Sequence, residues 1–242
     1  MMITRKHIFT FLFFVITIGV FSQITSGKII YERKTNLYKK FKNWDGVKEW
    51  IREEDRNKVD EFELVFNDTC SAFTPVESEL KESFGWATSK NAVYQNFNTG
   101  KKYMVKTIWG EGLNVNDSLT YRKWKITNNT RKIAGYVCRK AVWKANDSTR
   151  LYAWFSQELQ PSTGPETFNG LPGVILGLAT EDGGVVYFAK KVEVIKPEAI
   201  KLYPAKIRGK MYSGKELKAK LEKEYGKEKW GKAMIYENFG IW

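Results

Sequence analysis

Histidine is the first residue type to consider, because much acid–base and metal chemistry at neutral pH depends on its imidazole. The chain contains a single histidine, His7, which lies directly before an apolar run at the amino terminus. If that segment is removed, neither a Ser–His–Asp nor a Cys–His arrangement can form, and no histidine-based metal site can form. We therefore expect no catalytic residues of these kinds, no metal and no cofactor.

Paired carboxylates are the simplest catalytic chemistry left, since two acids facing one cleft can cleave a glycosidic bond. Glu158 and Glu166 flank a turn at Gly164-Pro165, and Glu181 and Asp182 lie together in a later turn. Acidic residues are mostly exposed and solvated. A histidine-free hydrolase is therefore the least favoured of the hypotheses below.

Cysteine is the remaining reactive residue type, and the chain has only Cys70 and Cys138. Two cysteines in an exported chain favour a disulfide, which in the chain-entropy model would stabilise the fold by roughly 4 kcal/mol. Two free, buried thiols are the alternative.

The amino terminus indicates whether the chain is exported. Arg5 and Lys6 precede an apolar run over residues 8–21, which is too short for a comfortable membrane span of roughly 20 residues. This order is typical of a secretion signal, so we expect residues 1–22 to be cleaved. An uncleaved anchor is the alternative. We expect export to the periplasm, the cell surface or the medium, with no membrane span after cleavage.

The composition limits the classes of partner. The net charge is +13, and the lysines are spread along the chain without a nucleic-acid module pattern. We expect no nucleic-acid partner, and we attribute the charge to solubility, with contact to an anionic membrane surface as the alternative.

The elements that must position any site are strands. Alternating apolar residues predict strands over 27–34, 61–66, 93–97, 102–109, 119–127, 135–143, 151–155, 174–178 and 185–195. Short turns between them predict one mainly β domain over 23–242, an antiparallel, strongly curved sheet, half-open barrel or sandwich. One amphipathic helix is expected within 42–60, and a basic helical tail at about 212–236, capped by Ser213.

The most distinctive segment is residues 162–176, in which residues 170–175 read GLPGVI. It resembles the signature of the GLPGLI family of exported bacterial proteins, with Val174 in place of the usual leucine. Further resemblance lies in residues 135–141, which read GYVCRKA, and in Ala153-Trp154-Phe155 followed by Gly164-Pro165. It covers nearly the whole chain up to about residue 195 and implies an exported protein of unassigned function.

The residues singled out as a motif or binding candidate are Trp154, Gly164, Pro165, Phe168, Gly170, Leu171, Pro172 and Gly173. They form either a tight structural turn or the rim of an apolar pocket. The favoured hypothesis is non-enzymatic binding of an apolar ligand or an envelope protein. An accessory role in outer-membrane transport or surface assembly ranks second, and the carboxylate hydrolase third.

Overall fold

The computed structural model describes residues 23–242 except 43, 78–82, 109 and 206–207. The predicted secretion signal, residues 1–22, lies outside the described residues. Within the described part, no helix combines the length and the apolar character needed to cross a bilayer.

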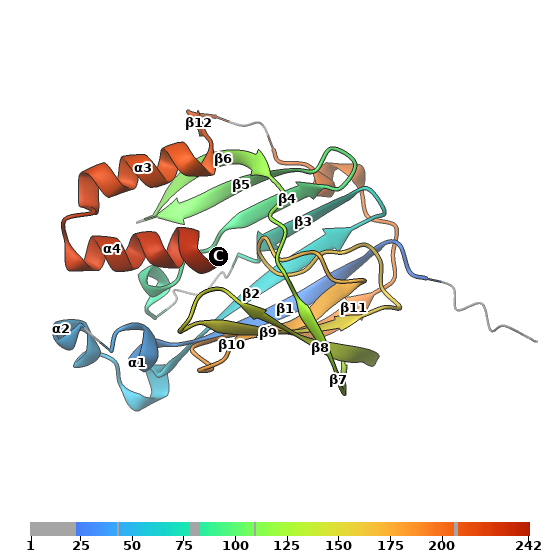
Figure 1. The fold of residues 1–242 in the computed structure, drawn as a ribbon, viewed down its shortest axis with the longest axis horizontal. Helices are drawn as coiled ribbons and strands as arrows, with labels where there is room; N and C mark the ends of the chain where they lie inside the picture. Colours follow the sequence, from blue (N-terminus) through green and yellow to red (C-terminus); the bar gives the residue numbers. More distant parts are fainter. Residues whose placement is uncertain (1–22, 43, 78–82, 109, 206–207) are drawn as a thin grey trace, which may run out of the picture.

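Twelve strands of the described chain form one continuous sheet (Figure 1). They are β1 (Gly27–Asn36), β2 (Asn57–Phe66), β3 (Cys70–Pro75), β4 (Ala92–Asn96), β5 (Lys101–Ile108), β6 (Glu111–Ser118), β7 (Lys125–Ile133), β8 (Tyr136–Lys144), β9 (Arg150–Ser156), β10 (Val174–Thr180), β11 (Val185–Glu193) and β12 (Met211–Tyr212). Their order is β12-β6-β5-β4-β3-β2-β1-β11-β10-β9-β8-β7, so β12 and β7 are the edges of an open sheet. All pairings are antiparallel except that of β12 with β6. The predicted mainly β, antiparallel fold class is confirmed.

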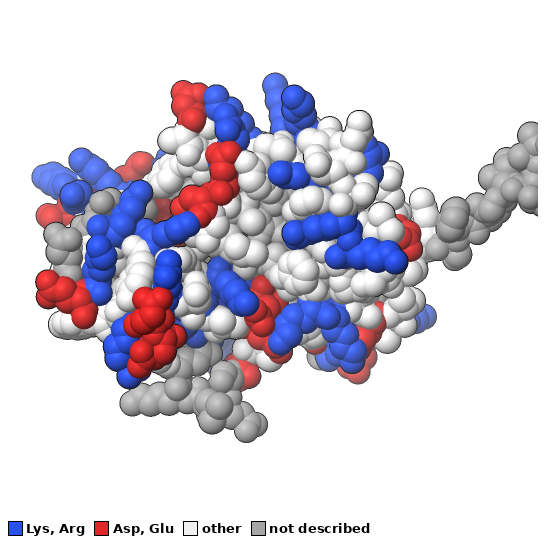
Figure 2. Space-filling model, turned by 90° about the horizontal axis from the view of Figure 1, so that it is seen from below, with Lys and Arg blue, Asp and Glu red and all other residues white. Residues whose placement is uncertain are grey.

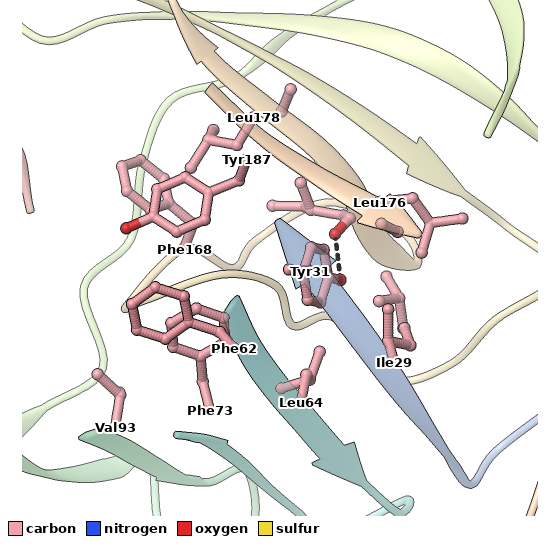
Figure 3. Packing of buried hydrophobic residues seen from close by; sticks show 14 of the residues in the cluster. Ile29, Tyr31, Phe62, Leu64, Phe73, Val93, Phe168, Leu176, Leu178 and Tyr187 are labelled. Atoms are coloured by element: carbon pink, nitrogen blue, oxygen red, sulfur yellow. Dashed lines mark hydrogen bonds between the residues drawn. The ribbon is translucent and has the colours of Figure 1, made fainter. Parts of the chain in front are cut away.

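The core lies on the inner face of this curved sheet, because alternate side chains of each strand point to the same side. Ile29 and Tyr31 of β1 are fully buried there with Phe62 and Leu64 of β2. Figure 3 shows Phe62 beside Phe73, and their rings are stacked with centroids 4.8 Å apart. The same view shows the Tyr31 hydroxyl donating to the carbonyl oxygen of Ile175, at 2.7 Å.

The carboxyl-terminal part is helical, with α3 (Gly214–Tyr225), α4 (Lys229–Tyr236) and a π-helical turn, η4 (Glu237–Ile241). Ser213 and Glu216 form a capping box at the start of α3, which confirms the predicted cap. Leu217 and Leu221 are buried against the main core. Figure 1 shows α3 and α4 side by side next to β5 and β6. The predicted single tail is thus two helices, with Gly226 as the carboxyl-terminal cap of α3.

Two sequence predictions are wrong in position. In place of one helix within 42–60 there are the short helix α2 (Asp45–Lys48) and a 3-10 turn, η1 (Glu53–Asp55), and another short helix, α1 (Leu37–Lys40), comes before this range. The reason is tertiary, since β2 pairs with β1 along its whole length and draws residues from 57 onward into the sheet. The strand expected over 119–127 is displaced, because β6 ends at Ser118 and only residues 125–127 of that range lie in a strand, at the start of β7 (Lys125–Ile133).

The disulfide prediction is corrected by the structure, in which both cysteines are free and buried. Cys70 lies on β3 and Cys138 on β8, and β2, β1, β11, β10 and β9 separate these strands in the sheet. Cys138 belongs to the main core, whereas Cys70 packs with Val65 and Leu202 in a separate small cluster. A disulfide needs Cα atoms within about 7 Å, which this arrangement does not provide.

We expect the purified protein to carry two free thiols that resist alkylation while it is folded. Burial, the largest influence, raises the pKa of Cys138 to about 12, so the reactive thiolate is scarce at pH 8. Iodoacetamide should add no mass to the folded protein, and two groups after unfolding without a reductant. A requirement for reductant before the unfolded chain can be alkylated would contradict this structure.

Candidate functional site

The motif loop, residues 157–173 between β9 and β10, folds back into the concave side of the sheet. From Thr163 to Asn169 its residues are buried, as are Leu171 and Gly173, whereas Gly170 and Pro172 are exposed. Buried side-chain hydrogen bonds fasten it: Thr163 to Ser71 at 2.8 Å, and the Asn169 amide to Gln95 at 2.9 Å. The loop is therefore anchored to β3 and β4 by buried hydrogen bonds.

Phe168 is the centre of the packing made by this loop. Its ring is fully buried and lies between the rings of Trp124, Trp143 and Trp242, with centroid distances of 6.3, 6.0 and 5.6 Å. The Trp124 indole donates to the carbonyl oxygen of Asn169 at 2.9 Å. Phe168 is thus held as a core residue, with its ring unavailable to a ligand.

Glu166 brings a carboxylate into the same buried region. It adopts a left-handed backbone conformation, with φ of 54°, which is uncommon for a residue other than glycine. One of its oxygens accepts from the Tyr187 hydroxyl at 2.8 Å and the other from the Asn91 amide at 3.2 Å. Arg33 lies 3.8 Å from the first oxygen.

Arg33 links Glu166 to a second buried acid, Asp60, whose side chain is fully buried and lies 2.7 Å from the guanidinium. Thr88 also donates to Asp60, at 2.9 Å. Burial by itself raises the pKa of Asp60, but the charges of Arg33 and Lys58 and their hydrogen bonds outweigh it and leave the pKa lowered. Asp60 is therefore ionised at neutral pH. We name Arg33, Lys58, Asp60, Thr88, Glu166 and Tyr187 the buried charge network.

The cavity beside this network is small. It has a volume of about 30 Å³ and is lined by Arg33, Asn91, Glu166 and Tyr187 among others. That is the space of about one water molecule. The network therefore holds the motif loop against β1, β2 and β11, and it has no room for a substrate.

A larger opening, of about 330 Å³, is lined by residues of the α1–α2 region, of the η2 turn (Gly85–Ala87) and of α4. Its aromatic walls are Phe41, Trp44, Trp86 and Trp230, and we name it the tryptophan groove. Trp86 is 63% exposed although its ring lies 5.5 Å from that of Phe41.

Polar groups also line the tryptophan groove, namely Lys40, Ser89, Glu237 and Asn238. Lys40 and Glu237 form an ion pair that joins α1 to the carboxyl-terminal turn. The groove thus offers indole faces together with hydrogen-bonding groups at their edges.

The predicted carboxylate pairs do not meet at one cleft. Glu158 and Glu181 are exposed, Glu166 is buried in the network, and Asp182 lies in the β10–β11 turn. Among the described residues, no group of three or more His, Cys, Asp or Glu converges as metal ligands.

Trp154 is also separated from the rest of the motif. Leu151, Ala153 and Phe155 of β9 are buried in the core, so Trp154 points to the opposite face, where Arg131 lies 4.3 Å above its ring. The structure therefore brings together the motif residues of the loop and leaves Trp154 apart.

Sequence reasoning missed the charge network and the tryptophan groove. One signal for the network was Arg33, which occupies a core position in the alternation of β1 after Ile29 and Tyr31. The groove had no comparable signal, because its tryptophans come from three segments that are distant in sequence.

Comparison with known proteins was made on the sequence and on the fold. No curated protein sequence matches the chain. The crystal structures of PNGF-II in space groups P21 and C2 both match with a TM-score of 0.54 and 17% identity over 78% of this chain. The match covers 32% and 31% of the PNGF-II chains, so this chain spans about a third of their length. At this identity the likeness shows a shared fold.

The sequence of residues 74–212 matches the family model described as "N-glycanase peptide, N-terminal domain". This range begins in β3, ends with β12, and contains the whole motif loop. Because the match covers more than half of the chain, the protein belongs to the family of N-glycanase peptide N-terminal domains.

Proposed function

We propose that this chain is a non-enzymatic carbohydrate-binding domain of an exported protein, with the tryptophan groove as its ligand site. The observation that carries the proposal is the set of three tryptophans, Trp44, Trp86 and Trp230, around one opening of about 330 Å³. A sugar ring has an apolar C–H face and polar hydroxyl edges. Indole rings pack against apolar faces, and the groups beside them can hydrogen-bond to the edges.

Family membership supports a glycan as the ligand, because the family's description refers to an N-glycanase. An apolar ligand inside the motif loop is less well supported, since the loop is packed around Phe168 and Glu166.

The exported setting remains a prediction that rests on residues 1–22 and on the resemblance to the GLPGLI family. The segments that carry the GLPGLI resemblance, from Gly135 to Ile175, lie within residues 74–212, which the N-glycanase family model matches. An accessory role at the outer membrane stays a second prediction. The paired-carboxylate hydrolase is disfavoured by the separation of its acids.

We expect Trp86→Ala to weaken glycan binding about tenfold, because an aromatic contact contributes roughly 0.5–1.5 kcal/mol beyond the area that it buries. Binding would be found with an array of neutral oligosaccharides released from glycoproteins. The affinity of the best one would then be measured by calorimetry.

Trp50→Ala is the matched control, since Trp50 is 73% exposed in the same region and does not line the groove. It should bind the oligosaccharide like the wild type. Equal affinities of the two variants, or no oligosaccharide bound at all, would refute the proposed site. Binding of a protein partner that both variants retain would move the function to another surface.

A further inference from the structure

A second opening lies on the other side of the carboxyl-terminal turn, between the inner face of β5 and the start of α3. Its volume is about 420 Å³, and we name it the basic pocket. Its charged lining residues are Lys102, Lys106, Arg122, Lys215 and Lys218 against the single acid Asp117. Asn238 lines both the basic pocket and the tryptophan groove, so the two openings flank the same segment.

The two lysines of β5 are buried, with exposures of 8% for Lys102 and 3% for Lys106. They occupy inward positions of the strand, on either side of Met104, in the alternating burial pattern of β5. Lys102 donates to the Thr120 hydroxyl and Lys106 to the carbonyl oxygen of Asn238, each at 2.7 Å.

Those acceptors are neutral, and each ammonium keeps two further N–H donors. Among the described residues, neither lysine has a carboxylate within the 4 Å of an ion pair. A buried charge without a counter-charge is unfavourable unless something else compensates it. The fold therefore maintains two buried positive charges, and no carboxylate of the described residues lies at ion-pair distance from either of them.

Arg122 adds a third cation from the segment before β7. Its terminal nitrogens donate to the carbonyl oxygen and the hydroxyl of Thr167, both at 2.8 Å. Its guanidinium carbon lies 4.0 Å above the Phe168 ring. Its Nε is buried and has no hydrogen-bond partner among the described residues. An unsatisfied, charged donor in a buried position is rare and calls for a partner.

We propose that the basic pocket binds a compact oxyanion, a carboxylate, sulfate or phosphate group carried by a small soluble molecule or by a sugar. Oxyanions accept several charge-assisted hydrogen bonds at once, which matches three cations with donors to spare. Trp143 and Trp242 also line the pocket and can pack against a ring that carries the anion. The proposal stands on this pocket alone and does not require the tryptophan groove to bind glycans.

The recessed position favours a small soluble ligand over a membrane surface. Lys102 and Lys106 are buried on the inner face of the sheet, and a flat bilayer cannot reach them. On the face drawn in Figure 2, Lys and Arg are interspersed with Asp and Glu and form no single basic patch.

The ionisation of Lys106 gives the binding a pH dependence. Burial, the largest influence, lowers the pKa of Lys106 to about 8; Lys102 lowers it further, whereas Glu166 and Glu237 raise it. Burial also lowers the pKa of Lys102, aided by Arg122. A lysine is charged below its pKa, so we expect affinity for sulfate to be full near pH 6 and to fall as the pH rises through about 8. The other charged groups facing the pocket are Asp117, Lys215 and Lys218.

The test is calorimetry and thermal unfolding of the full chain with sodium sulfate, sodium phosphate and galacturonate, at ionic strength matched with chloride. We expect saturable binding by the wild type, and at least a tenfold loss in Lys106→Met and in Lys102→Met. Galactose, which has the galacturonate ring without its carboxylate, tests whether the anion is needed. Preference for galacturonate over inorganic sulfate would identify a sugar acid, and the reverse a sulfate or phosphate group.

Two controls separate binding from folding. Lys132→Met removes an exposed lysine of β7 that does not line the pocket, and it should bind anions like the wild type. Removing a buried, uncompensated charge should leave the unliganded Lys106→Met protein as stable as the wild type or more stable. Arg122→Lys provides a third variant with the charge retained and the Nε donor displaced, and its affinity should fall.

Several results would overturn the proposal. These are no saturable binding at 10 mM of each anion, equal affinities of Lys106→Met and Lys132→Met, or binding only to vesicles of anionic lipid. If the tryptophan groove fails its own test while Lys106→Met still loses sulfate binding, the basic pocket stands alone.

Discussion

Replacing Asp60 by asparagine is expected to lower the free energy of unfolding by about 3–5 kcal/mol, as is found when one partner of a buried ion pair is removed. The asparagine keeps the shape of the side chain and removes its charge. Arg33 and Lys58, which lie 2.7 and 3.1 Å from the carboxylate, would then remain buried beside a neutral amide. Urea unfolding at pH 7, followed by tryptophan fluorescence, measures the loss.

Glu181→Gln is the matched control, because Glu181 pairs with Arg150 at 3.1 Å on the surface, where both side chains are about half exposed. Such a pair contributes roughly 0–1 kcal/mol. A loss in Asp60→Asn no larger than in Glu181→Gln would mean that the buried charge network does not stabilise the fold.

We also expect the stability difference between the wild type and Asp60→Asn to depend on pH. The pKa of Asp60 is lower in the folded protein than its ordinary value of about 4, so its stabilising effect is complete above that value. It is lost as the pH falls through the folded-state pKa. The stability difference between the wild type and Asp60→Asn should therefore be constant from pH 5 to 7 and shrink below about pH 4.

The second large effect is expected for Gly173→Ala, at the end of the motif loop. Gly173 has φ of 134°, a conformation that a residue with a side chain rarely adopts. A Cβ atom there would lie 2.0 Å from the carbonyl oxygen of Ser156 and 2.7 Å from its carbonyl carbon. These are backbone atoms of β9, and Ser156 pairs with Val174, so relief would require the two strands to separate.

In Gly173→Ala, backbone strain costs roughly 1–3 kcal/mol, and the clash of the added methyl group with Ser156 costs a similar amount. We therefore expect the free energy of unfolding to fall by about 2–6 kcal/mol. Gly100→Ala is the control: Gly100 has φ of 64° in the β4–β5 turn, and nothing lies within 4 Å of the place that a Cβ atom would take. That variant should lose about 1–2 kcal/mol, the strain alone. If both variants lose the same amount, the close approach of residue 173 to β9 is not a determinant of the fold.

Much of the architecture follows from short-range patterns. The alternation of buried and exposed residues in β1 and β2 is visible in the sequence, because successive side chains of a strand point to opposite faces. The turn between β4 and β5, with Gly100 in a left-handed conformation, follows from residue type. The capping box of Ser213 and Glu216 depends on residues three apart.

The site could not be derived in this way, because its contacts join residues that are far apart in sequence. Arg33 and Glu166 meet only because β1, β2 and β11 are neighbours and the loop folds back over them. Two cysteines in one chain suggested a bond, but the strand order keeps them apart. The identification of Gly170 to Gly173 as a tight turn needed only residue types, whereas the burial of Lys106 beside Asn238 needed the carboxyl-terminal helices in place. Local conformation is set by neighbouring residues, and the charge environment of each group is set by whatever the complete fold packs around it.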